Sequence, residues 1–185
     1  MRKIHITGAS GSGTTTLGRA LGERLGWAHL DSDDFFWVKT DPPFQTKRDT
    51  QERTDSLLAA LGAAPAWVLS GSIMGWSRLE PPGFDLVIFL SLPSDVRMAR
   101  LRAREEERYG AAALEPNGAQ YQESVDFLAW AAAYEEAETV GRNRIAHERW
   151  LAEQTCPILR LDSTNSVQHN VEAVVTWLHR SIDCS

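Results

Sequence analysis

The sequence predicts one α/β domain with three α/β/α layers around a five-stranded parallel sheet. Apolar segments at residues 4–7, 27–30, 67–70, 85–90 and 157–161 alternate with amphipathic stretches of helical periodicity. The run Leu-Val-Ile-Phe-Leu within residues 85–90 is typical of a strand buried on both faces. This alternation indicates parallel strands covered by helices on both faces, with the ligand site at the strands' carboxyl ends.

Helical periodicity predicts helices at residues 14–25, 47–61, 94–108, 127–134, 142–150 and 167–182. Gly26 and Gly62 end the first two, and Ser94, directly after Pro93, is a favourable N-cap for the third. Residues 109–118 read as a loop that is too short to separate two domains, so we expect residues 1–185 to form a single unit.

The composition limits the classes of function. A chain of 185 residues can bury a substantial core, and its net charge of −6 argues against a general nucleic-acid or membrane binder. Cys156 and Cys184 are too few for a disulfide framework, and the first strand begins without a leader-like segment. We therefore expect a cytoplasmic protein, monomeric or homodimeric, that acts on a small molecule.

The strongest motif, GASGSGTT, lies between the first strand and the first helix. Compared with G-x-x-x-x-G-K-[ST], it has Gly8, Gly13 and Thr15 in register, while Thr14 stands in the place of lysine. Glycines let successive N–H groups converge on phosphate oxygens, and the helix that follows adds its positive end. The Thr15 hydroxyl is suited to a phosphate-bound Mg²⁺. We expect ATP to be bound by Gly8, Ser10, Gly11, Ser12, Gly13, Thr14, Thr15 and Thr16.

Thr14 implies that another cation must enter the site, or that turnover is slow. Lysine supplies a full charge near the β- and γ-phosphates, whereas threonine supplies only a hydroxyl. Arg142 and Arg144 follow a predicted helix break and are candidates for this catalytic role. Arg104 and Arg108 are candidates for covering the nucleotide from a short lid-like segment at residues 104–120.

Arg97 and Arg100 share a helix face with those two lid arginines. For this pair we expect a solvated surface position, balanced by the acidic residues 105–107.

An acidic cluster, Asp31, Asp33 and Asp34, follows the second strand. The chain lacks the N-K-x-D and D-x-x-G strings of GTPases, and its central strands do not end in the acid that ATPase motors use. In a small-molecule kinase, such carboxylates organise Mg²⁺ or accept the proton of the substrate hydroxyl. The alternative is that they cap a helix or lie in a solvated loop.

These motifs resemble the small P-loop kinases of the adenylate kinase and shikimate kinase type. Residues 29–33, HLDSD, resemble the D-x-D of shikimate-kinase-like enzymes, which implies a catalytic and Mg²⁺-organising role for Asp31 and a catalytic and substrate-holding role for Asp33. Residues 85–90 and the arginine-rich helix resemble the strand and lid-bearing helix of adenylate-kinase-like proteins. The ending GSGTTT resembles the lysine-less loop of archaeal-type cytidylate kinases.

Residues 29–31, 36–37, 67–71 and 127–130 also resemble an adenylate-kinase-related group described as DNA-topology modulation proteins. Ser70 departs from the adenylate kinase pattern, which has an aspartate before the glycine at this place. The resemblance to a nucleoside monophosphate kinase is therefore incomplete.

Together these features predict a Mg²⁺-dependent kinase that transfers the γ-phosphoryl group of ATP to a small-molecule acceptor such as a nucleoside or nucleotide. Trp37 and Arg78 join Asp33 as candidates for binding the acceptor. The alternative function, favoured by Thr14, is a nucleotide-binding sensor or regulatory protein with little turnover.

Overall fold

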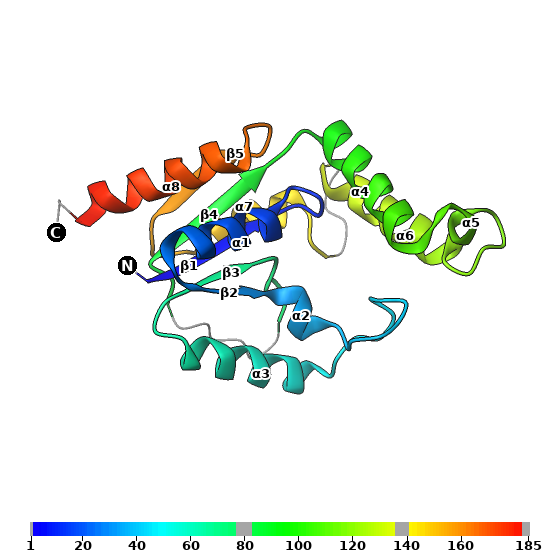
Figure 1. The fold of residues 1–185 in the computed structure, drawn as a ribbon, viewed down its shortest axis with the longest axis horizontal. Coiled ribbons are helices and arrows are strands. Elements are labelled where there is room, and N and C mark those ends of the chain that lie inside the picture. The colour runs from blue at the N-terminus through cyan, green and yellow to red at the C-terminus, as the bar shows by residue number, and fades with distance from the viewer. Residues whose placement is uncertain (1, 77–82, 136–140, 183–185) are drawn as a thin grey trace.

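A parallel sheet with helices on both faces confirms the predicted α/β fold (Figure 1). The computed structural model describes residues 2–76, 83–135 and 141–182. Its strands are paired in parallel in the order β2-β3-β1-β4-β5. They are β1 (Lys3–Gly8), β2 (Ala28–Asp31), β3 (Trp67–Ser70), β4 (Leu86–Ser91) and β5 (Ile158–Asp162). Because β1 is the middle strand, the loop that follows it leaves from the centre of the carboxyl edge.

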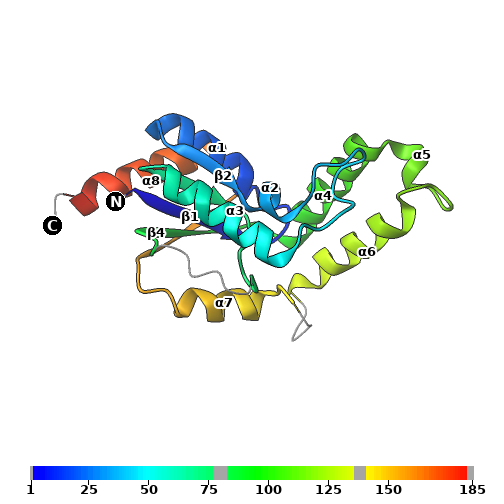
Figure 2. The same cartoon turned by 90° about the horizontal axis from the view of Figure 1, so that it is seen from below.

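Two pairs of helices cover the sheet (Figure 2). Helices α1 (Thr14–Leu25) and α8 (Val167–Ile182) pack on one face, and α3 (Thr50–Ala63) and α7 (Arg144–Ala152) pack on the other. Alternate residues of β4 serve the two cores: Ile88 lies in the first and Val87 and Phe89 in the second. This alternation explains why the strand is almost uninterruptedly apolar.

Asp85 fixes the start of the central strands. The sequence places it in the fourth strand, whereas the structure begins β4 one residue later, at Leu86. The Asp85 carboxylate accepts the backbone N–H groups of Arg2 and Lys3, the latter at 3.0 Å. The Asp85 N–H donates to the Lys3 carbonyl at 2.8 Å. The polar residue therefore anchors β1 from outside the strand.

A helical hairpin extends from the carboxyl side of the sheet (Figure 1). It comprises α4 (Ser94–Tyr109), α5 (Ala111–Leu114) and α6 (Tyr121–Ala132), followed by the 3₁₀ helix η1 (Ala133–Glu135). Met98 and Leu101 of α4 pack against Ala131 of α6. The hairpin is longer than the lid-like segment predicted at residues 104–120, and α5 lies within the predicted loop.

Helix α7 begins two residues later than the sequence indicates. The Asn143 side chain is its N-cap and accepts the Ala146 N–H at 2.8 Å, so that Arg142 precedes the helix. An N-cap residue is extended, which frees the residue before it from the helix axis. In the described ranges, no helix has the length and apolarity needed to cross a membrane.

Close packing of α1 on the sheet depends on Gly18. A Cβ at Gly18 would lie 2.7 Å from the His29 Nε2 and 3.0 Å from the Ser70 Cβ. We expect Gly18→Ala to lower the free energy of unfolding by about 1–3 kcal/mol, measured by urea denaturation. Gly62→Ala is the matched control in α3, where the added Cβ meets open space. It should raise stability by about 0.5–1 kcal/mol through helix propensity, and equal effects at both sites would contradict this reading.

Candidate active site

The loop after β1 has a backbone that only glycine adopts without strain at two positions. Gly11 and Gly13 have φ values of 84° and 93°. At Gly8 a Cβ would lie 2.4 Å from the Leu90 carbonyl oxygen of the neighbouring strand. Gly13 is also the N-cap of α1 and makes no side-chain cap, which leaves the first N–H groups of α1 available to a ligand.

A large cleft at the carboxyl edge of the sheet contains this loop. Its lining includes the predicted residues Gly8, Ser10, Gly11, Gly13, Thr14, Thr15 and Thr16. Ser12 differs from them, because its side chain is buried below the loop and its N–H donates to the Ala9 carbonyl at 3.1 Å. The structure therefore brings seven of the eight predicted loop residues to the cleft and gives Ser12 a position inside the turn.

Asp31 caps a short helix that the sequence analysis did not predict. Helix α2 (Ser32–Phe36) begins directly after β2, and Asp31 Oδ1 accepts the Asp33 N–H at 3.0 Å. Its Oδ2 accepts the Ser70 hydroxyl at 3.0 Å. Asp31 is buried and is not among the residues that line the cleft. Its contacts favour the capping interpretation over a position on Mg²⁺, because both carboxylate oxygens are already engaged.

Asp33 lines the cleft, where its side chain is accessible. The walls of the cleft remove much of its water, and this desolvation, followed by repulsion from Asp31, raises the pKa of the Asp33 carboxyl. The charges of Arg142 and Arg104 act in the opposite direction and lower that pKa. Asp31 therefore both orients Asp33 through the cap and favours its protonated form.

Arg142 lies at the glycine loop. Its Nη2 donates to the Ser10 hydroxyl at 2.6 Å, and its guanidinium lies 5.1 Å from the centre of the Trp130 ring. Arg142 lines the cleft together with Asp33. Arg144, the second candidate, is exposed and donates instead to Glu135 at 3.1 Å. The N-cap of α7 separates these two arginines, so the structure brings one of them to the cleft and leaves the other on the surface.

Arg97 does not have the solvated position that the sequence predicts. It is 0% exposed, and its Nη1 donates to the carbonyls of Ser10 at 3.2 Å and Ala131 at 2.9 Å. The prediction fails because the face of α4 that carries Arg97 packs against α6 and the glycine loop. Arg100 is exposed but lines the cleft, and its Nη1 lies 3.4 Å from the Ser163 hydroxyl.

The two predicted lid arginines also line the cleft. Arg108 pairs with Glu105 at 3.0 Å and lies 4.4 Å from the centre of the Phe44 ring, while Arg104 lies 6.0 Å from that of Phe127. The hairpin also contacts the segment after α2: the Tyr109 hydroxyl donates to the Pro43 carbonyl at 3.1 Å. A third contact joins the side chains of Gln45 and Gln120 at 3.1 Å. The two walls of the cleft therefore touch.

Aromatic side chains form the wall of the cleft below α2. Phe36, Trp37, Phe44 and Trp76 line it, and Trp37 lies edge-on to both Phe36 and Phe44. Sequence reasoning missed Arg53, whose guanidinium lies 4.6 Å from the centre of the Phe36 ring and 4.9 Å from the centre of the Trp76 ring. Its only signal was a position in the helix after the acidic cluster. Arg78, predicted to bind the acceptor, lies outside the described residues.

A buried hydrogen-bonded chain lies beneath the loop. Thr7 is the residue before the last in β1, and its Oγ1 lies 3.1 Å from His147 Nε2. The Tyr134 hydroxyl lies 2.8 Å from His147 Nδ1. Burial and the charge of Arg142 lower the pKa of His147 to about 3. The neutral ring has one donor and one acceptor nitrogen, so one hydroxyl donates to it and the other accepts. No motif in the sequence marks His147 as a site residue.

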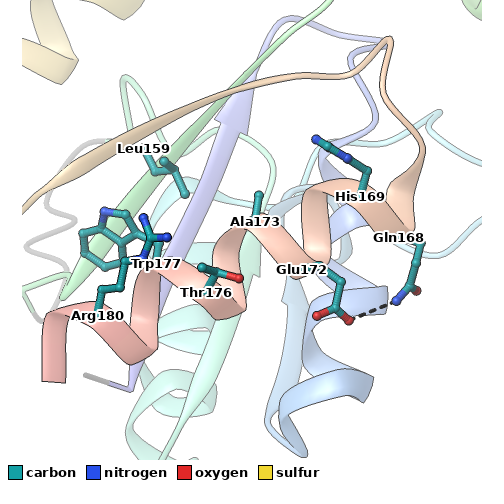
Figure 3. Close-up of a pocket in the computed structure, with 8 residues that line it drawn as sticks. All are labelled: Leu159, Gln168, His169, Glu172, Ala173, Thr176, Trp177 and Arg180. Atoms are coloured by element: carbon teal, nitrogen blue, oxygen red, sulfur yellow. Dashed lines mark hydrogen bonds between the residues drawn. The ribbon is translucent and has the colours of Figure 1, made fainter. Parts of the chain in front are cut away.

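A second pocket lies away from the loop, between β5 and α8 (Figure 3). Leu159 and Trp177 lie beside exposed polar residues of α8, including Glu172, which accepts from Gln168 at 3.0 Å. This pocket contains none of the glycine-loop residues. Across residues 2–76, 83–135 and 141–182, no group of three or more His, Cys, Asp or Glu could hold a metal. The site with the predicted chemistry is therefore the cleft above the central strands.

Comparison with known proteins identifies the family. Residues 4–126, more than half of the chain, match the family AAA_18, which is described as an AAA domain. The chain belongs to this family. The AAA_18 match spans β1, the glycine loop, the acidic cluster and the hairpin as far as α6.

Relatives of this AAA_18 chain include an uncharacterized protein, YqaC of Bacillus subtilis (strain 168), which is 42% identical over 177 residues, 96% of this chain and 97% of that protein. A cytidylate kinase of Methanocorpusculum labreanum is 27% identical over 120 residues, 56% of this chain and 63% of the relative. A shikimate kinase of Psychrobacter cryohalolentis is 30% identical over 118 residues, 57% and 61% of the two chains.

A solved structure shows the same fold. Deoxyadenosine kinase from M. mycoides with bound dATP has a TM-score of 0.57 and 14% identity, covering 96% of this chain and 99% of that one. The family match, the kinase relatives and this fold confirm that the AAA_18 chain is a P-loop protein of the adenylate kinase and shikimate kinase type.

The raised pKa of Asp33 predicts a stability effect. The folded chain holds the Asp33 proton more tightly than the unfolded chain does, so this contribution to stability is complete below the unfolded pKa and is lost as pH rises through the folded pKa. Asp33→Asn should therefore raise the Tm at pH 7, and the gain should shrink in acid, in thermal unfolding followed by circular dichroism.

Asp34→Asn removes the same charge from the same turn of α2 and is the matched control for this measurement. A larger gain in Tm for Asp33→Asn than for Asp34→Asn is expected. An Asp33→Asn variant that is less stable than wild type at pH 7 would contradict the assignment of Asp33 as a desolvated carboxylate.

Proposed function

We propose that the chain is an ATP-dependent kinase that transfers the γ-phosphoryl group to a small acceptor of the nucleoside or nucleotide class. The observation that carries the proposal is that one cleft holds the glycine loop, a carboxylate with a raised pKa and an arginine at the loop. The acceptor class is supported by the aromatic wall and, as an analogy, by the cytidylate kinase relative.

The loop fits the phosphates of ATP. The left-handed glycines and the start of α1 supply several neighbouring backbone N–H donors. No side-chain cap at Gly13 competes with a phosphate for them. Thr15, which lines the cleft, would bind Mg²⁺ through its hydroxyl, and the other ligands would be phosphate oxygens and water, which is the coordination that Mg²⁺ favours. When bound, the metal would neutralise charge on the transferring phosphoryl group.

Asp33 is the proposed general base and acceptor-binding carboxylate. Its raised pKa makes it a better proton acceptor than an ordinary aspartate, and the N-cap contact from Asp31 holds the start of α2 in place. Asp31 thus acts through Asp33 as a positioning residue in this scheme.

Arg142 is proposed to take over the charge of the missing lysine. It already donates to Ser10 in the glycine loop, and packing against Trp130 orders its long side chain. A guanidinium held beside the loop can stabilise charge that develops on the transferring phosphoryl oxygens. Arg104 and Arg108 would cover the nucleotide from the hairpin, and Arg100 lies where the hairpin meets the loop after β5.

On the acceptor side, Trp37 and Phe44 offer flat apolar faces for stacking a ring. Arg53 adds a positive group held between Phe36 and Trp76, and its Nε is buried without a hydrogen-bond partner among the described residues. An acceptor with both a ring and an anionic group fits this wall, and Arg78 stays a prediction.

The kinase proposal is tested by ADP release from MgATP in the presence of nucleosides, nucleotides and small alcohols. We expect one acceptor class to raise ADP release well above the rate with water alone. Asp33→Asn should reduce the stimulated rate by roughly 10²- to 10⁴-fold, the usual contribution of a general base. If no acceptor stimulates release, the proposal fails.

Thr14 favours one competing function, a nucleotide-binding sensor with little turnover. Calorimetry with ATP measures binding and the ADP-release assay measures transfer; both, performed on wild type and on Thr14→Lys, separate the two functions. Tight ATP binding without phosphoryl transfer in both proteins would support the sensor. Transfer that increases in Thr14→Lys would show a kinase site limited by charge at this position.

Replacing Arg142 tests its role directly. We expect Arg142→Met to lower kcat by roughly 10²- to 10³-fold, with a smaller change in KM for ATP, because the charge acts mainly on the transition state. Arg149→Met, an exposed position of α7, is the matched control. Arg144→Met decides between the two arginines that the sequence left open. A loss there equal to that of Arg142→Met would contradict the assignment.

A further inference from the structure

Arg97 is a fully buried cation that lies directly behind the glycine loop. A Cβ at Gly11 would lie 3.0 Å from the Arg97 Cγ and 3.1 Å from its carbonyl oxygen, so the stem of the side chain is packed flush against the loop. Its Nη1 donates to the Ser10 carbonyl at 3.2 Å. Arg142 lines the cleft and Arg97 does not, so the two arginines reach Ser10 from different elements and only Arg142 is open to the cleft.

The charge of Arg97 is not balanced by an ion pair within the described ranges. Its Nε and Nη2 are buried without a hydrogen-bond partner there, and its contacts are two backbone carbonyls and the Tyr134 ring at 5.3 Å. Burial lowers the pKa of Arg97, and Glu135, whose charge acts in the opposite direction, is itself paired with Arg144. Burying an arginine in this way is costly unless a negative charge comes close.

We propose that Arg97 is a second, fixed cation of the phosphate site, which supplies part of the charge of the missing lysine from behind the loop. This inference rests on the proposed phosphate binding by residues 8–16 and extends it. A polyphosphate bound by the loop would bring negative charge close to the guanidinium of Arg97, which donates to the Ser10 carbonyl of that loop. Because Arg97 is fully buried, this attraction would be screened less than at a surface.

The surroundings of Arg97 hold it in this position. Tyr134, on which the guanidinium lies, is hydrogen-bonded to His147, and His147 contacts Thr7 at the end of β1. These contacts connect Arg97 to β1, the strand that precedes the loop. Unlike a lid arginine, it needs no movement to act, so we assign it to binding of the phosphates rather than to a step of the reaction.

The proposal is tested by calorimetry with inorganic tripolyphosphate and Mg²⁺ on the full chain. Arg97→Gln keeps amide donors for the two carbonyls and removes the charge, and Arg97→Lys keeps the charge and removes the fork. We expect Arg97→Gln to bind tripolyphosphate roughly tenfold to thirtyfold more weakly, as for a unit charge at several ångströms in a low-dielectric setting. Arg97→Lys should recover most of that loss.

Arg102→Gln, an exposed position on the same helix outside the cleft lining, is the matched control for net charge. A tripolyphosphate affinity that is unchanged in Arg97→Gln, or equally weak in Arg97→Gln and Arg97→Lys, overturns the proposal. If Arg97→Gln does not fold, Arg97→Lys decides alone, and a tenfold loss in it is the overturning result. Tripolyphosphate needs no phosphoryl transfer, so loss of the kinase proposal in the ADP-release assay would leave this result standing.

Discussion

Ser10 is the point on which the proposed phosphate site depends, because two guanidinium groups from different elements contact it. Arg142 donates to its hydroxyl from the cleft side, and Arg97 donates to its carbonyl from within the protein. Both contacts tie the hairpin and the segment before α7 to the loop. The same two hydrogen bonds therefore help to hold the loop and bring two positive charges to it.

On the side of the cleft that carries Asp33, Ser70 stands in the place of an acid. Adenylate kinases have an acid where this chain has Ser70, and here the Ser70 hydroxyl joins His29 and Asp31 at 2.9 and 3.0 Å. The carboxylate thus comes from the end of β2 and is held by the end of β3. Its function is local, because it caps α2 and so fixes where Asp33 enters the cleft.

Local patterns made the strands and the glycine loop predictable from sequence. The apolar composition of the β4 segment indicates that it is buried. The spacing of Gly8, Gly13 and Thr15 is enough to identify the glycine loop. Arg97 was not predictable in this way, since helical spacing tells which residues share a face but not what that face contacts. For Asp31 the sequence allowed two interpretations, a role in organising Mg²⁺ or the capping of a helix. Only the tertiary contact with Ser70 favours one of them, the cap. Arg142 and Arg144 are two positions apart in the sequence. The Asn143 cap lies between them, so Arg142 precedes α7 and lies at the cleft, whereas Arg144 lies in α7 on the surface.

The contacts across the mouth of the cleft have a thermodynamic consequence. Arg108, Tyr109 and Gln120 belong to the hairpin that faces the glycine loop, and their partners Phe44, Pro43 and Gln45 belong to the segment beside the aromatic wall. A displacement of either segment breaks contacts that the other one shares. If the two halves bind a nucleotide and an acceptor, as proposed, these contacts link the two binding events. The linkage is reciprocal: the factor by which the nucleotide changes the affinity for the acceptor equals the factor by which the acceptor changes the affinity for the nucleotide.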